Sequence, residues 1–208
     1  RRRYWARATV GWPRVRAAEP TPAHHALAAL ESQGRLGGLV TQNVDGLHRA
    51  AGSRAVIPLH GRLSEVICMA CGAVQPRDAV HAALLRLNPG WERRGAELLP
   101  DGDAILPDHE VQAFRVLPCA CGGPLKPHVV FFGESVPRDR VDTARDWLAS
   151  ADALLVLGSS LHVFSGFRFV KYAQQAGTPV GIVNLGPTRG DPLATVRIEG
   201  EVGEVLER

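Results

Sequence analysis

Two spacings of apolar residues alternate along the chain and predict helices between short strands. In residues 21–36, TPAHHALAALESQGRL, Ala and Leu recur at the spacing of an amphipathic helix, with Thr21 as N-cap and Gly34 as stop signal. Residues 37–42, GGLVTQ, form a short apolar run typical of a buried strand. The same patterns predict further helices over 140–151, 166–177 and 203–208, extended segments over 125–134, 152–160, 179–186 and 193–200, and part of a helix over 1–13.

The order of these elements predicts an α/β fold. Near-continuous apolar strands that alternate with helices are typical of a parallel sheet covered on both faces, as in Rossmann-like domains. Residues 62–127 differ, because they hold all four cysteines and an irregular stretch over 87–110. We therefore expect a Rossmann-like domain formed by 1–61 and 128–208, with 62–127 inserted as a small zinc-binding module. Residues 1–20 could belong to the smaller part.

Composition and charge narrow the classes of function. The 208 residues are 45% hydrophobic and 22% charged, which suits one domain, or one large domain with a small insertion. The net charge is only +3 and the arginines are scattered apart from Arg1–Arg3, so we expect no direct nucleic-acid binding. No apolar run approaches the length of a membrane span, so we expect no membrane association.

The four cysteines form two close pairs about fifty residues apart, Cys68 with Cys71 and Cys119 with Cys121. Thiols so close in sequence are poorly placed to bridge each other, but four thiolates can complete a tetrahedral zinc shell. The second pair, CACGG, is one residue tighter than the common spacing, so one ligand must reach the metal differently. Two disulfides or four unrelated thiols are the alternatives. We expect a closed, structural zinc site.

Polar residues follow three of the predicted strands directly. TQNVD follows GGLV, GSS follows ALLVL, and NLG follows PVGIV. Ligands of open parallel sheets bind beyond the carboxyl ends of the strands, where small residues and amides allow a phosphate or ribose to approach. A single cluster of this kind is more often a simple turn. Three clusters on successive strands favour a nucleotide-binding site.

These motifs resemble one family in the same order. TQNVDGLHRAAG, LHG at 59–61, the paired cysteines, LKPHVVFFGE, LGSSL and VNLGPT are similar to the sirtuins, NAD-dependent protein deacylases, over essentially the whole chain. RYWARATVGWP and GSSLHVFSGFRF look most like the class II branch. Family members carry an upstream glycine-rich cofactor loop that this sequence lacks. Because the sequence also lacks an initiator Met, we expect it to be a piece of a longer protein.

The resemblance implies a role for each polar cluster. His60 would be the general base that takes a proton from a ribose hydroxyl, and Asn43 would hold a ribose hydroxyl or a water. Asp45 would accept from the nicotinamide carboxamide, although an Asp before a helix is also a favoured N-cap. The alternative for His60 is a core or turn histidine. The residues implied to bind NAD are Gln42, Asn43, Val44, Asp45, Gly158, Ser159, Ser160, Asn184, Leu185, Gly186 and Val202.

The resemblance also implies the substrate and the reaction. An acylated-lysine protein would add a strand beside VVFFGE and a loop near 161–165, with Val129, Phe131, Gly133 and Glu134 in contact with it. The acyl group would pass to ADP-ribose as nicotinamide leaves. The alternatives are protein mono-ADP-ribosylation, or a zinc-stabilised binding fragment without activity. We expect a monomer, in the cytoplasm of a bacterium or in the mitochondrial matrix of a eukaryote.

Overall fold

The computed structural model describes residues 1–93, 96–99 and 104–207, which divide into two compact units. The first unit comprises Arg1–Ala18, Val44–Gly46 and Gly61–Val129. The second comprises Glu19–Asn43, Leu47–His60 and Val130–Arg208. Each unit therefore combines segments that are distant in the sequence.

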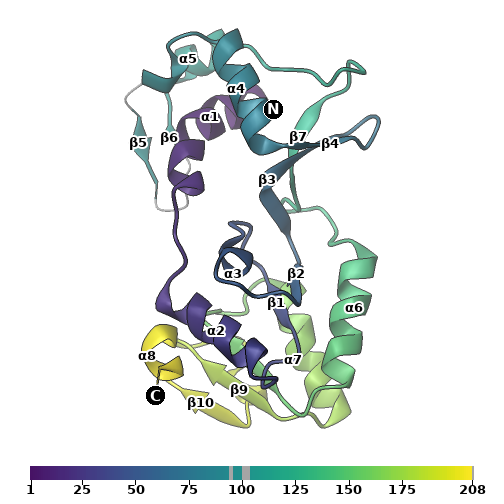
Figure 1. The fold of residues 1–208 in the computed structure, drawn as a ribbon. Coiled ribbons are helices and arrows are strands. Elements are labelled where there is room, and N and C mark those ends of the chain that lie inside the picture. The colour runs from purple at the N-terminus through teal and green to yellow at the C-terminus, as the bar shows by residue number, and fades with distance from the viewer. Residues whose placement is uncertain (94–95, 100–103, 208) are drawn as a thin grey trace. The chain divides into compact units, whose positions relative to one another are not determined.

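The first unit is built on an antiparallel sheet of order β4-β3-β7 (Figure 1). Strand β3 pairs with both neighbours, and its register with β7 shifts between Arg62 and Val66. A smaller antiparallel pair, β5-β6, completes the strands described in this unit. The elements are α1 (Arg2–Arg16), β3 (Gly61–Cys68), β4 (Val74–Pro76), α4 (Arg77–Leu87), η1 (Trp91–Arg93), β5 (Glu97–Leu98), β6 (Ala104–Ile105), α5 (Asp108–Ala113) and β7 (Leu125–Val129).

Buried aromatic side chains form the core of the first unit. Trp5 of α1 is 1% exposed, and its indole Nε1 donates to the carbonyl of Leu125 at 3.1 Å. The guanidinium of Arg77 lies over Trp5 at 4.8 Å and over Trp12 at 5.2 Å. Because buried indole and guanidinium groups need polar or π partners, these contacts fix α1 against α4 and β7.

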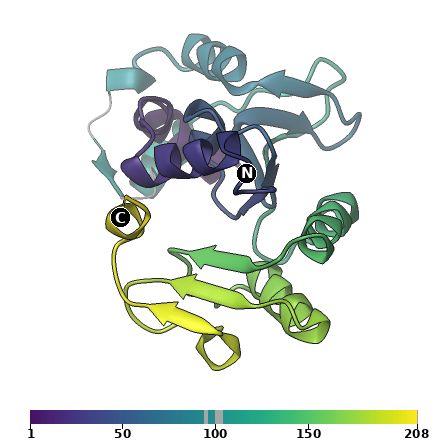
Figure 2. The ribbon, with the colours of Figure 1, turned by 60° about the horizontal axis from the view of Figure 1, so that its bottom comes forward.

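The second unit carries parallel strands. Strands β10, β9 and β8 lie side by side in that order and run in one direction (Figure 2), and β1 pairs with β2 in a separate parallel pair. The elements are α2 (Pro22–Ser32), β1 (Leu39–Thr41), α3 (Leu47–Ala50), β2 (Val56–Pro58), α6 (Arg138–Ala149), β8 (Leu154–Leu157), α7 (Phe164–Ala176), β9 (Val180–Val183), η2 (Asp191–Leu193), β10 (Val196–Ile198) and α8 (Val202–Leu206).

Helices cover both faces of this parallel arrangement. Val180 and Ile182 of β9 are buried in one cluster with α6 and α7, including Val141 and Val170. On the other side Leu27 of α2 packs with β1 and β2, and Leu157 and Leu206 lie against this second cluster. Alternate residues of a strand face opposite sides of a sheet, so two separate apolar clusters result.

The structure confirms the α/β class with parallel strands and each helix predicted from periodicity. Thr21 does cap α2, in a capping box that His24 completes. One extended segment was wrong in part: β7 ends at Val129, and the chain turns over 131–134. Gly133 has φ +90°, and the Glu134 carboxylate accepts from the Phe131 amide at 3.0 Å, which together stabilise a turn.

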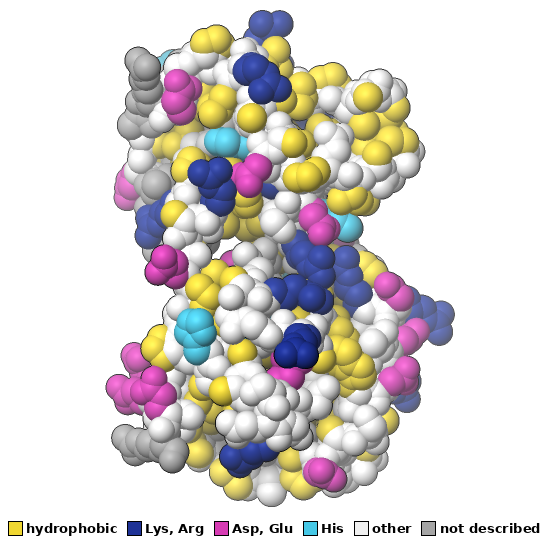
Figure 3. Space-filling view, in the orientation of Figure 1, with side chains coloured by type: hydrophobic (Ala, Val, Ile, Leu, Met, Phe, Trp, Pro, Cys, Tyr) yellow, Lys and Arg dark blue, Asp and Glu magenta, His cyan; other side chains and the backbone are white. Residues whose placement is uncertain are grey.

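Helix α4 was not predicted, although Val80 and Leu84 give it a buried face. Helix α5 begins at the end of the stretch 87–110 that was expected to be irregular and extends beyond it. Within the described residues, no helix has the length and apolar character needed to span a bilayer. Acidic and basic side chains both occur on the face drawn in Figure 3, among exposed apolar ones.

Candidate active site

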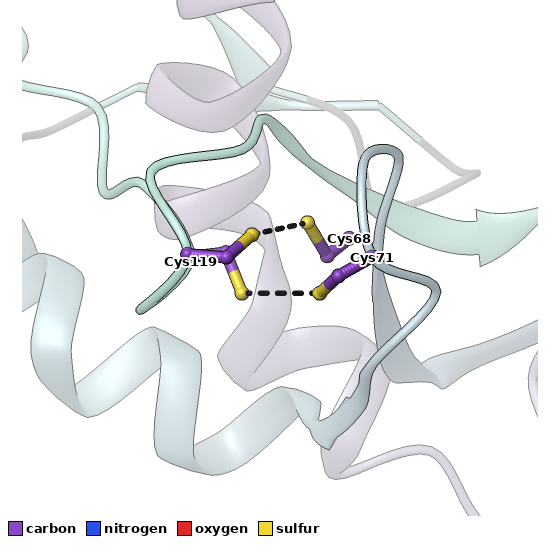
Figure 4. Close-up of side chains that lie close together, drawn as sticks. Cys68, Cys71 and Cys119 are labelled. Atoms are coloured by element: carbon purple, nitrogen blue, oxygen red, sulfur yellow. Dashed lines mark hydrogen bonds between the residues drawn. The ribbon is translucent and has the colours of Figure 1, made fainter.

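The four cysteines of the first unit converge on one point. All four Sγ atoms lie within 4.8 Å of one another, with Cys68 and Cys121 at 3.6 Å and Cys71 and Cys119 at 3.9 Å. Figure 4 shows the labelled sulfurs turned toward one another from two separate segments. A disulfide needs about 2.0 Å, whereas four sulfurs around one zinc lie about 3.8 Å apart. The geometry therefore fits a tetrahedral zinc shell and not two disulfides.

A tight turn brings the closely spaced second pair into this shell. The amide of Gly122 donates to the carbonyl of Cys119 at 2.8 Å, and the amide of Cys119 donates to the carbonyl of Gly123 at 2.9 Å. A Cβ on Gly123 would lie 2.7 Å from the sulfur of Cys68. The glycines after the pair thus provide the room that the shorter spacing requires.

The charges of the thiols also favour a cation at this point. Amide hydrogen bonds from Cys71, and more weakly from Ala70, lower the pKa of Cys68 to about 6. The Gly123 amide acts to lower the pKa of Cys121, but the neighbouring thiols of Cys71 and Cys68 outweigh it and raise that pKa to about 12. Negative charge on one sulfur therefore disfavours ionisation of its neighbours, and a bound divalent cation would offset this repulsion and allow all four sulfurs to become thiolates.

In the second unit the carboxyl ends of β1 and β8 are joined through Gln42. The hydroxyl of Ser159 donates to the Oε1 of Gln42 at 3.3 Å, and the amide of Leu161 donates to the same hydroxyl at 3.2 Å. The side chain of Gln42 comes so close to α7 that a Cβ on Gly166 would lie 2.6 Å from Oε1. Two of the three predicted strand-end clusters therefore meet directly.

His60 lies in the same network, two residues after β2. Its Nδ1 lies 3.1 Å from the carbonyl oxygen of Gln42, and its Nε2 lies 2.7 Å from the hydroxyl of Ser165. Burial lowers the pKa of His60, and the hydrogen bond to the Gln42 carbonyl opposes this in part. The imidazole is therefore neutral at physiological pH, the form that accepts a proton.

Ser165 was missed by the sequence analysis. It was part of a segment expected to be a loop near 161–165, but Phe164 and Ser165 begin α7. Its side chain is buried and also lies 3.4 Å from Nε2 of Gln42. A small polar residue at the start of an apolar helix was the only available signal, and it is common at helix N-termini.

The loop after β8 contains a strained residue. Leu161 has φ +57°, unusual for a residue with a side chain, and it is 4% exposed. Gly158 also has a positive φ, and a Cβ there would lie 3.4 Å from the side chain of Val202. Ser160 is exposed, and its carbonyl accepts from the amide of Arg189. Positive φ values next to a strand end are typical of loops that bind ligands closely.

The polar group after β9 is braced from within. The side-chain amide of Asn184, a buried residue, donates to the carbonyls of Leu185 at 3.0 Å and Gly186 at 3.1 Å. The guanidinium of Arg197 donates to the same Gly186 carbonyl at 2.7 Å. Leu185 is 63% exposed at this end of the strand. The amide of Gly158 donates to the carbonyl of Val183, so the loops after β8 and β9 are neighbours.

The remaining predicted site residues are divided between the units. Asn43 ends a segment of the second unit and is exposed, with its amide donating to the hydroxyl of Thr41 at 3.1 Å. Val44 and Asp45 belong to the first unit, where the Val44 carbonyl accepts from the Leu63 amide. Of the four residues expected to contact substrate, Val129 ends β7, while Phe131, Gly133 and Glu134 lie exposed in the turn that follows.

Comparison with known proteins gives one consistent result. The Sir2 family model matches residues 1–165. An NAD-dependent protein deacetylase of Xanthomonas axonopodis pv. citri is 55% identical over 207 residues, covering 99% of this chain and 71% of the relative. The human mitochondrial NAD-dependent protein lipoamidase sirtuin-4 is 47% identical, with 99% of this chain and 66% of that protein covered.

Solved structures agree with the sequence relatives. A structure of Sir2 with a p53 peptide and NAD+ superposes with a TM-score of 0.73 and 30% identity, covering 94% of this chain and 70% of that one. A structure of Sir2Tm bound to a propionylated peptide gives a TM-score of 0.74 and 31% identity, over 94% and 71% of the two chains. On the length and identity of these matches, the chain belongs to the Sir2 family, the sirtuins.

Proposed function

We propose that this protein is an NAD-dependent protein-lysine deacylase in which His60 is the general base. The observation that carries this proposal is the position of the His60 imidazole, held at the carboxyl end of β1 by the Gln42 carbonyl at 3.1 Å. Burial also lowers the pKa of His60. A general base needs a lone pair near neutral pH and a fixed orientation, and this arrangement supplies both. NAD would supply the ribose carbon that receives the acyl oxygen when nicotinamide leaves.

His60 would take the proton of a ribose hydroxyl and become an imidazolium. The proton leaves the hydroxyl oxygen, and the new N–H at Nε2 holds it until it is returned to the departing amine. The Gln42 carbonyl remains an acceptor for Nδ1–H in both states, so the ring need not turn during the transfer. Asn43, exposed after β1, would orient the same ribose through its amide.

We assign NAD binding to the polar strand ends. The loop of Gly158, Ser159 and Ser160 would lie against the phosphates, where amides and hydroxyls can donate without a bulky side chain in the way. Asn184, Leu185 and Gly186 would hold the distant ribose, with Val202 beside the adenine. Gln42 and Val44 would line the nicotinamide end, and Asp45 would accept from its carboxamide.

The substrate would be an acylated lysine in an extended peptide. Phe131 is 40% exposed and Phe132 is 96% exposed just after β7, so an added strand would find an apolar surface there. The turn of Gly133 and Glu134 would limit how far such a strand can pair. Relatives are named as deacetylases and as a lipoamidase. We therefore propose acylated lysines as the substrate class and assign no one preferred acyl group.

The structural cluster of Cys68, Cys71, Cys119 and Cys121 would hold one zinc ion. All four ligands are sulfurs, so no position is left for water or substrate. The zinc would stabilise the first unit and take no part in the reaction. We further propose a monomer without nucleic-acid partners, in the bacterial cytoplasm or the mitochondrial matrix.

The experiment is to incubate the purified protein with an acetyl-lysine peptide, with and without NAD. The expected result is one nicotinamide and one free O-acetyl-ADP-ribose for each lysine deacetylated, and no deacetylation without NAD. ADP-ribose attached to a protein side chain in place of free product would favour mono-ADP-ribosyl transfer. Hydrolysis without NAD, or no reaction with either, would contradict the proposal.

A further inference from the structure

Both ring nitrogens of His60 are occupied, and the partners fix its tautomer. The carbonyl of Gln42 can only accept, so Nδ1 at 3.1 Å must carry the hydrogen. A neutral imidazole then has its lone pair on Nε2. The hydroxyl of Ser165, 2.7 Å from Nε2, therefore donates to this lone pair.

Ser165 is itself held from two directions. It lies in the first turn of α7, and the residue is 8% exposed. The amide nitrogen Nε2 of Gln42 lies 3.4 Å from its hydroxyl, and Oε1 of the same amide accepts from Ser159. The hydroxyl can thus accept from Gln42 while it donates to His60, which leaves little freedom for either side chain.

Glycine at the next position makes this approach possible. A Cβ on Gly166 would lie 2.6 Å from Oε1 and 2.8 Å from Cδ of Gln42, so any larger residue would push the amide away from Ser165. The Ser-Gly pair at the start of α7 thus places the Ser165 hydroxyl against His60, and the missing side chain of Gly166 leaves room for the Gln42 amide. Neither contact arises from neighbours in sequence, because Ser165 and His60 are 105 residues apart.

We propose that Ser165 is a positioning residue for His60. Its hydroxyl holds the neutral imidazole by Nε2, in the orientation and tautomer that proton abstraction requires, until the reacting hydroxyl takes its place at that nitrogen. After proton transfer the Ser165 oxygen can accept a hydrogen bond from the new Nε2–H of His60. This inference rests on the proposed role of His60 and adds a residue that acts through it.

The first test compares Ser165→Ala with Ser53→Ala in the NAD-dependent deacylation assay. Within the described residues, Ser53 is a buried serine (4% exposed) whose hydroxyl has no hydrogen-bond partner, so its loss controls for removing a buried hydroxyl. We expect Ser165→Ala to lower kcat about tenfold, less than the roughly hundredfold loss of a general base itself. Ser53→Ala should change kcat by less than about twofold, because Ser53 has no role in the proton transfer.

Two further readouts distinguish the positioning role of Ser165 from a merely structural one. Exchange of labelled nicotinamide into NAD requires no proton abstraction, so Ser165→Ala should reduce exchange by less than about twofold. In a His60→Ala background, Ser165→Ala should cause no further loss of product, because the residue through which it acts is gone. Equal losses of exchange and product, or a full further loss in that background, would overturn the proposal.

The hydrogen bond can also be measured without NAD or substrate. In ¹⁵N spectra of the unliganded protein, the Nε2 signal of His60 should be that of an acceptor nitrogen and should move in Ser165→Ala but not in Ser53→Ala. An unmoved signal would overturn the proposal whatever the activity. Suppose that the wild-type protein does not deacetylate the peptide with NAD, while the Nε2 signal still moves in Ser165→Ala. The proposed function then fails and the contact between Ser165 and His60 stands. The positioning role inferred for Ser165 in the reaction would then fall with the function.

Discussion

The cysteine cluster of the first unit and the His60 network of the second are held together in opposite ways. The cluster joins two short sequence pairs, Cys68 with Cys71 and Cys119 with Cys121, and a single ion can satisfy all four sulfurs. The network joins β1, β8, α7 and the end of β2 through single hydrogen bonds of 2.7 to 3.4 Å. Loss of one ligand should therefore affect folding, whereas loss of one hydrogen bond should affect chemistry.

The largest expected effect comes from breaking the cluster. Structural zinc sites contribute about 10–16 kcal/mol, which is comparable to the total stability of about 5–15 kcal/mol for a typical domain. Cys119→Ser, or removal of the metal by a chelator, should therefore unfold the first unit. Elemental analysis of the wild-type protein should find about one zinc per chain.

Hydrogen exchange measures this separately for each unit. Amides of β3 and β7 should lose protection in Cys119→Ser, while those of β8 and β9 keep most of theirs. Ser150→Ala, an exposed substitution in the second unit, serves as the control. A protein that binds less than a tenth of an equivalent of zinc and still protects β3 would refute the structural role.

A smaller effect is expected from Gly61, which follows His60 and begins β3. Its φ is +88°, and a Cβ there would lie 2.1 Å from the carbonyl oxygen of His128. Gly61→Ala combines a left-handed backbone with a clash against backbone, so it should cost about 2–4 kcal/mol of unfolding free energy. Urea unfolding compares it with Gly37→Ala, where nothing lies within 4 Å of the added Cβ. Equal costs for the two variants would show that β3 can shift away from β7.

The smallest effect concerns Glu31, which supports the loop before β2. Its carboxylate accepts from the backbone amides of Arg54 at 2.8 Å and Ala55 at 2.7 Å. Both hydrogen bonds lower the pKa of Glu31, and the bond from Ala55 has the larger effect. Because Glu31 is partly exposed, Glu31→Gln should cost only about 1 kcal/mol at neutral pH. A pKa lowered in the folded state contributes stability above the ordinary glutamate value and loses it as the pH falls through the folded value.

The difference between wild type and Glu31→Gln should therefore shrink in acid. Urea unfolding at neutral pH and near pH 3, about one unit below the ordinary glutamate pKa, measures it. A difference that stays constant or grows toward low pH would mean that the carboxylate charge is not what holds Arg54 and Ala55.

Sequence reasoning succeeded where ligands or apolar positions are close in the chain. The spacing of the cysteines indicated a four-thiolate site, and apolar periodicity indicated α2, α6 and α7. The helical pattern of α4 was readable as well, with Val80 and Leu84 one turn apart. It lies between the two cysteine pairs, in the segment 62–127 that was interpreted as a zinc-binding module and in which no helix was predicted.

Long-range contacts were beyond the same reasoning. Gln42 and Ser159 are 117 residues apart, and nothing local indicates that their side chains meet. His60 was singled out by resemblance, not by its spacing, and Ser165 was not singled out at all. The turn over 131–134 was also missed, because an apolar run ending in Phe131 and Phe132 is equally typical of a strand.

The central claim is that His60 takes a proton in a step that follows nicotinamide release. The most direct test is to measure nicotinamide exchange and deacylated product side by side in His60→Tyr. Product formation should fall roughly 100-fold or more, while exchange and the binding of NAD and peptide should be largely retained. Equal loss of exchange and product would mean that His60 shapes the pocket, and an unchanged rate of product formation would contradict its role as the base.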